Sequence, residues 1–160
     1  MAAEKITYEQ FLATVDESNN VFMEVLHNYF LENGCKGTYE EKKSGLLASY
    51  KHIKLKKVIA NVLFRKKGML VRIYGENINK YMDFMNSLPH EMVQSIQNAG
   101  DCKRLISNGC STKCKGYDFL IGDNHFQKCR YNCFEFLVTD ESRPHIMTFI
   151  ENEIKQRTAA

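Results

Sequence analysis

Residues 57–74 read KVIANVLFRKKGMLVRIY, and this stretch decides the fold. Two segments rich in Val, Ile, Leu and Phe, at 57–64 and 69–74, flank the connection at 65–68. Strand-forming residues on both sides of a short connection that ends in glycine are typical of an antiparallel β-hairpin, because glycine supplies the positive φ of the turn. The sequence therefore predicts two adjacent antiparallel strands in the middle of the chain.

Toward the N-terminus the pattern changes from strand to helix. Residues 45–51 predict one further strand. Apolar residues between 21 and 30 recur every three or four positions, which predicts an amphipathic helix that ends at Asn33 and Gly34. Thr7 and Gln10 have the spacing of a capping box, so a short helix is expected over 7–15.

Toward the C-terminus two short helices are expected after Asn77 and from Pro89. Residues 117–121 and 125–131 predict a second hairpin with its turn at 122–124, and the apolar residues 134–138 follow it. Residues 142–157 predict a closing helix with one apolar stripe, formed by Ile146, Phe149, Ile150 and Ile154.

These elements predict the α+β class in a single domain over 1–160. We expect N-terminal helices, an antiparallel sheet of five or six strands, helices packed on one face of it, and a C-terminal helix. Every uncharged apolar run is too short to span a bilayer, and the first ten residues carry acids without an apolar signal segment. We therefore expect a cytoplasmic protein with no membrane partner.

Five of the six cysteines lie in a cysteine-rich hairpin subregion at 101–138, with the spacing C-x7-C-x3-C-x14-C-x3-C. They are Cys102, Cys110, Cys114, Cys129 and Cys133. In a protein that keeps its thiols reduced, two short cysteine pairs around a hairpin favour zinc over a disulfide framework, because four thiolates satisfy a tetrahedral Zn²⁺. Inert, packed thiols are the alternative, but the polar, glycine-flanked loop around Cys110 and Cys114 is unusual for core cysteines.

Strand geometry guides the choice of ligands. If the second strand of the hairpin continues through residue 131, Cys129 and Cys133 are about 13 Å apart, too far to share one ion. Cys102 follows the end of a helix and has seven residues in which the chain can return. We therefore expect Cys102, Cys110, Cys114 and Cys129 to bind zinc, with Cys133 as the alternate ligand. Cys35, which follows a predicted helix end, is expected to be unreactive.

The stretch from residue 57 to residue 133 resembles small uncharacterised bacterial proteins. In these, a β-hairpin and a helix lead into a cysteine segment at 102–105, a CxxxC loop at 110–114 and a K-C-R-Y strand at 128–131. The resemblance covers about half of the chain and implies no named activity. It favours Cys129 over Cys133 as a ligand, because K-C-R-Y is the recognisable element.

We expect binding rather than catalysis, with no catalytic residues. The chain has no P-loop, no nucleophile elbow, no H-E-x-x-H and no dinucleotide-binding glycine run. A zinc ion held by four thiolates has no open position and is structural. The sequence thus predicts a binding or sensing module of open biological role. The alternatives are a redox or metal-responsive thiol switch, with Cys133 resolving Cys129, and a small-ligand (effector) binding domain with its pocket near Tyr81, Met82 and Met85.

Positive charge is concentrated in residues 42–75, which contain ten basic residues and no acidic one, although the whole chain has a net charge of only +3. Six of them flank the predicted strand at 57–64: Lys54, Lys56, Lys57, Arg65, Lys66 and Lys67. If these side chains converge on one surface, they form a positive field for nucleic acid or another polyanion. If they do not, they are solvating charge that protects strand edges.

Overall fold

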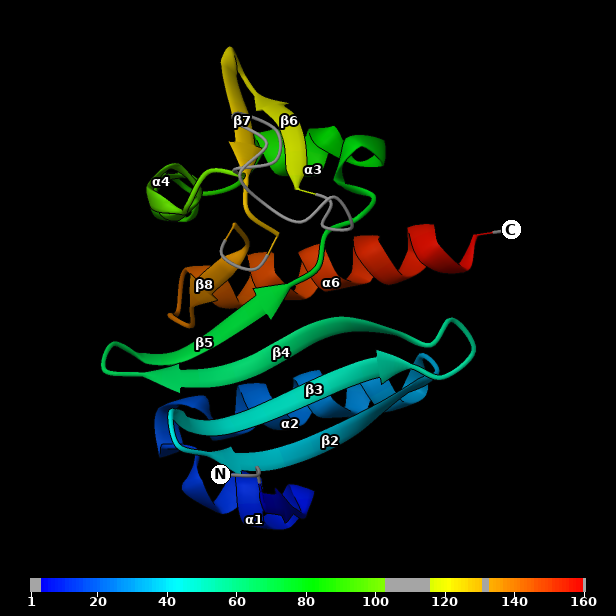
Figure 1. The fold of residues 1–160 in the computed structure, drawn as a ribbon, viewed down its shortest axis with the longest axis vertical. Coiled ribbons are helices and arrows are strands. Elements are labelled where there is room, and N and C mark those ends of the chain that lie inside the picture. The colour runs from blue at the N-terminus through cyan, green and yellow to red at the C-terminus, as the bar shows by residue number, and fades with distance from the viewer. Residues whose placement is uncertain (1–3, 103–115, 131–132, 160) are drawn as a thin grey trace.

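An antiparallel sheet is the centre of the fold in the computed structural model, which describes residues 4–102, 116–130 and 133–159. The strand order is β1-β2-β3-β4-β5-β8, and every neighbouring pair is antiparallel. The strands are β1 (Glu4–Ile6), β2 (Cys35–Lys42), β3 (Gly45–His52), β4 (Lys57–Arg65), β5 (Gly68–Ile73) and β8 (Glu135–Leu137). The expected α+β architecture is confirmed (Figure 1).

Helices and a second hairpin complete the domain. The helices are α1 (Tyr8–Thr14), α2 (Glu17–Glu32), the 3₁₀ turn η1 (Ile78–Lys80), α3 (Met82–Asn86), α4 (His90–Asn98) and α6 (Ser142–Thr158). The separate two-stranded sheet consists of β6 (Tyr117–Ile121) and β7 (Asn124–Lys128). In Figure 1, α2 and α6 lie behind the large sheet, and the β6–β7 hairpin extends away from it beside α3 and α4. None of the helices in the described ranges combines the length and apolar character that crossing a bilayer requires.

The central hairpin forms where residues 57–74 predict it. Arg65 pairs with Gly68, so that only Lys66 and Lys67 connect the two strands, a shorter turn than the four-residue connection that the sequence suggests. Gly68 has φ +126°, a conformation that favours glycine over residues with a side chain. The two-residue turn fixes the register of β4 against β5.

Helix α2 buries part of the apolar stripe that the sequence predicts, which consists of Val21, Phe22, Val25, Leu26, Tyr29 and Phe30. Its buried face contains Phe22, Met23, Leu26 and Phe30, whereas Val21 is 71% exposed. These buried positions follow the i, i+3, i+4, i+7 pattern of one helix face. Met23, which lies just beside the predicted stripe, is fully buried, whereas Val25 is 50% exposed, so the buried face is rotated slightly from the predicted one.

A cluster of aromatic side chains attaches the N-terminal helices to the sheet. Nδ1 of His27 lies 2.8 Å from the hydroxyl of Tyr50 and 3.1 Å from that of Tyr39. The ring of Tyr8 stacks on His27 with a centroid separation of 3.6 Å. Partial burial lowers the pKa of His27 from 6.5, while the more distant charge of Glu9 opposes the shift. The neutral imidazole is therefore the form that suits this packing.

Candidate functional site

The β6–β7 hairpin has a tighter turn and a different register from those expected. Ile121 pairs with Asn124, so Gly122 and Asp123 form a two-residue turn, with Gly122 at φ +58°. The expected turn spanned three residues, and removing one residue from the turn shifts every cross-strand pair by one. Tyr117 therefore pairs with Lys128 rather than with Cys129.

The chain before the undescribed segment 103–115 pairs with the end of β7. The amide of Cys102 donates to the carbonyl oxygen of Gln127 at 2.9 Å, and the amide of Cys129 donates to the carbonyl oxygen of Gly100 at 2.8 Å. These bonds continue the hairpin into a short third ladder, in which Asp101 bridges to Lys128. Backbone hydrogen bonds thus hold Cys102 beside the end of β7, which Cys129 directly follows.

Lys128 anchors this ladder to the end of α4, a role that the sequence analysis did not assign. Its Nζ donates to the carbonyl oxygens of Gln97 and Ala99 at 3.0 Å each and to Oδ1 of Asp101 at 2.9 Å. A lysine ammonium at a helix C-terminus satisfies carbonyls that lack helical partners and complements the helix dipole. The buried ammonium therefore holds the end of α4 against the end of β7.

The chain after residues 103–115 returns to the same place. A Cβ atom added to Gly116 would lie 2.3 Å from Sγ of Cys102 and 3.1 Å from the carbonyl oxygen of Lys128. Because real Cβ atoms do not approach other atoms so closely, only glycine fits here. Both ends of the undescribed segment, Cys102 and Gly116, therefore meet at the end of β7.

Cys133 lies one turn after Cys129, which corrects the expected continuous strand through residue 131. Strand β7 ends at Lys128, and the amide of Cys133 donates to the carbonyl oxygen of Cys129 at 3.0 Å. An i+4 to i hydrogen bond closes a compact turn, so the estimate of about 13 Å between the two cysteines no longer applies. Cys133 is fully buried in the hydrophobic core, and this burial raises the pKa of its thiol well above the ordinary value.

The predicted zinc ligands are only partly placed by the structure. Cys102 is buried and Cys129 is half-buried, both as free thiols, while Cys110 and Cys114 lie outside the described residues. Within residues 4–102, 116–130 and 133–159, no three His, Cys, Asp or Glu side chains come together as metal ligands. Cys35 lies apart from this region on β2, and its burial raises the pKa of its thiol to about 11.

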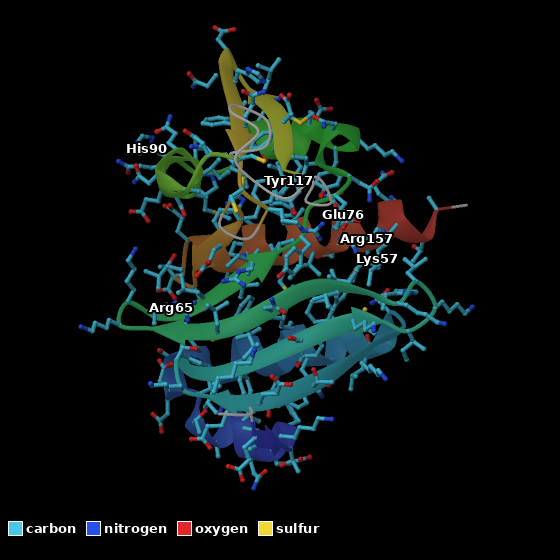
Figure 2. The ribbon with its side chains drawn as sticks, viewed as in Figure 1. Lys57, Arg65, Glu76, His90, Tyr117 and Arg157 are labelled. Carbon is cyan, nitrogen blue, oxygen red and sulfur yellow. The ribbon has the colours of Figure 1, made fainter. Side chains whose placement is uncertain are left out.

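The six residues of the expected polyanion surface do not converge. Lys54, Lys56 and Lys57 belong to the β3–β4 turn and the start of β4. Arg65 ends β4, and Lys66 and Lys67 form the β4–β5 turn at the other end of the same strand. A nine-residue strand separates its ends by about 26 Å, and Figure 2 shows Lys57 and Arg65 at opposite ends of the sheet. The second triplet lines an open groove of about 770 Å³ against α4.

Helix α6 carries a buried ion pair between Glu153 and Arg157 that was not predicted from the sequence. Glu153 is 0% exposed and accepts hydrogen bonds from Nε of Arg157 at 2.6 Å and from the hydroxyl of Tyr81 at 2.5 Å. It also accepts from the backbone amide and Nδ2 of Asn77 at 3.1 and 3.0 Å. Burial and the adjacent carboxylate raise the pKa of Tyr81. One signal was present in the sequence: Glu153 stands inside the apolar stripe of α6.

The stripe proposed for an effector pocket is divided between core and surface. Tyr81 and Met85 are buried in the hydrophobic core, where Tyr81 also contacts Phe149 edge-on. Met82 is half-buried and lines an open pocket of about 540 Å³ that also contains Phe119 and Leu120. Small-ligand binding at this position stays a prediction.

The chain matches no protein family, no curated protein and no solved structure. The resemblance to small bacterial proteins therefore stays a prediction.

Proposed function

We propose that the protein is a non-catalytic, cytoplasmic binding or sensing module whose cysteine-rich hairpin holds one structural zinc ion. The ligands would be Cys102, Cys110, Cys114 and Cys129. The observation that carries the proposal is the meeting of Cys102, Gly116 and the end of β7, because it brings both ends of the segment that contains Cys110 and Cys114 to the place where Cys129 follows β7.

Chain length supports the same ligand set. Cys114 is two residues from Gly116, and two residues span at most about 7 Å. Gly116 itself lies against Sγ of Cys102, so the thiol of Cys114 is restricted to the neighbourhood of Cys102. Two sulfurs on one zinc ion are roughly 4 Å apart at bond lengths of about 2.3 Å, which this restriction permits.

The chemistry of four thiolates determines the role. A Zn²⁺ ion with four cysteine ligands has no position left for water, so it stabilises structure and does not activate a nucleophile. Here it would join the end of α4 to the β6–β7 hairpin, the part of the domain farthest from the large sheet (Figure 1). The hairpin already packs through Tyr117, Phe119, Ile121 and Phe126 in the hydrophobic core, and the metal would add a cross-link at its open end.

Metal analysis tests the proposal. Protein purified without chelator should contain about one zinc per chain, and Co²⁺ exchanged into the site should give the visible absorption of tetrahedral thiolate coordination. Cys114→Ser and Cys129→Ser should lose the metal, whereas Cys35→Ser, at the distant buried cysteine, should keep it. Metal-free protein in which all six thiols titrate would overturn the proposal.

A thiol switch is the second candidate, and the turn from Cys129 to Cys133 favours it. In a helical turn, residues i and i+4 have Cα atoms about 6 Å apart, within the range of roughly 4.4–6.8 Å that a disulfide requires. An oxidant such as peroxide would take two hydrogens as the Cys129–Cys133 bond forms. Metal-free protein that loses 2 Da on mild oxidation, reversibly with dithiothreitol and not in Cys133→Ser, would support the switch in place of zinc.

A further inference from the structure

The β3–β4 turn exposes aliphatic and cationic side chains side by side. Of residues 51–57, only His52 is buried. Ile53 is 56% exposed and Leu55 is 38% exposed, and they alternate with lysines. The exposed lysines of this turn are Lys51, Lys54, Lys56 and Lys57. We call residues 51–57 the lysine–aliphatic turn.

The lysine–aliphatic turn is held in one conformation by hydrogen bonds. The amide of Lys56 donates to the carbonyl oxygen of His52 at 2.8 Å, and the amide of Leu55 donates to Nδ1 of His52 at 3.2 Å. The amide of Ile53 donates to the carbonyl oxygen of Gly34 at 2.9 Å. These hydrogen bonds fix the backbone so that the side chains of Ile53 and Leu55 stay exposed to solvent.

The positive charge of the turn is mostly uncompensated. Within the described residues, ion pairs involve Lys57, which lies 3.8 Å from Glu76, but not Lys51, Lys54 or Lys56. Lys36 on β2 pairs across the ladder with Lys51 and adds another exposed cation. Residues 51–57 and the adjoining start of β2 therefore expose several cations side by side.

Lys56 occupies a backbone conformation that is unfavourable for lysine. Its φ of 56° makes it the one residue other than glycine with a positive φ in the described part of the chain. Glycine adopts this left-handed region without the steric cost that a Cβ atom brings. Lys56 therefore adds its charge to the turn at a steric cost that glycine would avoid.

From these observations we infer that the lysine–aliphatic turn binds the anionic surface of a phospholipid bilayer. Ile53 and Leu55 would enter the interfacial region, and the lysines would contact the lipid phosphates and carboxylates. Nucleic acid fits less well, because its bases stack on aromatic side chains and this turn has none. The expectation of no membrane partner rested on the lack of a spanning segment, which a surface contact does not need.

A tryptophan reporter tests insertion directly, because the chain contains no tryptophan. Ile53→Trp places a single indole in the turn, and Leu120→Trp places one at the β6–β7 hairpin, where Leu120 is 53% exposed. Mixed with vesicles of phosphatidylcholine and phosphatidylserine, the Ile53→Trp protein should show a blue shift in its emission. The Leu120→Trp protein should show none, and neither should shift with phosphatidylcholine alone.

Sedimentation of the full chain with the same vesicles measures the affinity. Ile53→Ser/Leu55→Ser keeps the charge and should weaken binding by at least tenfold, as expected from the lost aliphatic burial. Lys54→Glu/Lys56→Glu should abolish binding, whereas Lys66→Glu/Lys67→Glu, with the same change in net charge at the β4–β5 turn, should leave it within about twofold. Circular dichroism should show that all variants are folded.

Lys56→Gly separates this function from a structural role of the turn. The variant should melt a few degrees higher, because glycine relieves the left-handed strain, and it should bind anionic vesicles roughly fivefold more weakly. The inference fails if wild-type protein does not sediment with anionic vesicles even at low salt, or if both paired lysine variants lose affinity equally. If the protein binds a labelled oligonucleotide but not vesicles, and Ile53→Ser/Leu55→Ser leaves the oligonucleotide binding unchanged, the turn is assigned to nucleic acid instead.

Discussion

Glu153→Ala tests how strongly the buried ion pair of α6 supports the fold. The substitution leaves Arg157, whose side chain is 4% exposed, without its closest carboxylate and removes the acceptor of Tyr81 and Asn77. Removing one member of a buried ion pair costs about 3–5 kcal/mol, because the remaining charge is uncompensated. For a domain of this size, 1 kcal/mol lowers Tm by roughly 2–4 °C, so a decrease of roughly 6–20 °C is expected.

The geometry of Arg157 explains why its partner matters. Its guanidinium also donates to the carbonyl oxygens of Tyr74 at 2.6 Å and Val58 at 3.3 Å, which join α6 to the start of β4 and to the residue after β5. Glu76 lies 3.9 Å from the guanidinium and is 29% exposed, so it replaces the lost carboxylate only in part. Figure 2 shows Glu76 and Arg157 near each other at this end of the sheet.

A double-mutant cycle measured by urea and thermal denaturation, followed by circular dichroism, provides the assay. Glu153→Met and Arg157→Met should each be strongly destabilising, whereas the double variant should be less so than the sum of the two, because no buried charge remains unpaired. Glu151→Gln, on the exposed side of the same helix, is the control and should leave Tm unchanged. A Tm decrease below 2 °C for Glu153→Ala, or strict additivity of the two Met substitutions, would refute the reasoning.

Three other changes have defined outcomes. Burial lowers the pKa of His27 in the folded protein, so the stability that the neutral imidazole contributes is complete above pH 6.5 and is lost as the pH falls through the folded-state pKa. His27→Gln should therefore flatten the pH dependence of the free energy of unfolding in urea between pH 7 and 5. An unchanged pH dependence would contradict this. Thr7→Ala removes the capping box of α1 and should cost about 1 kcal/mol in the same assay, while Thr7→Ser should be nearly neutral. Gly116→Ala places a methyl group 2.3 Å from Sγ of Cys102 and should cost about 1–3 kcal/mol and reduce bound zinc; wild-type stability and metal content would mean that the two segments do not meet.

Local sequence signals were sufficient for the elements that carry their own periodicity. The central hairpin, the capping box at Thr7 and the apolar stripe of α6 were all predicted, and the structure confirms them. Strand β2 was not, because its sequence, CKGTYEEK, is mostly polar and buries only Cys35 and Tyr39. Such a strand is stabilised by its partner β3 rather than by its own propensity, which a single-sequence pattern does not record.

The relation between Cys129 and Cys133 depended on where the second strand of the hairpin ends. A strand through residue 131, which the sequence predicts, would separate the two cysteines along one extended segment. The strand ends at Lys128 instead, and the amide of Cys133 donates to the carbonyl oxygen of Cys129. The shorter turn at Gly122 and Asp123 changes only the cross-strand partners, so that Tyr117 pairs with Lys128. Residues 128–134 contain no glycine or proline that would mark the end of a strand, so the sequence pattern favoured continuing it.

The predicted polyanion surface was wrong for a different reason. Positions 54–57 and 65–67 are close in the sequence and equally basic, so a composition window treats them as one patch, yet β4 separates them. The two turns also differ in a property that charge counting omits. The β3–β4 turn exposes Ile53 and Leu55, whereas the connection at Lys66 and Lys67 contains cations alone. Electrostatic attraction to a polyanion is available to both turns, but only the first adds apolar area that water disfavours and a bilayer interface accepts. The exposed aliphatic side chains, and not the number of lysines, therefore determine which of the two turns is suited to a membrane surface.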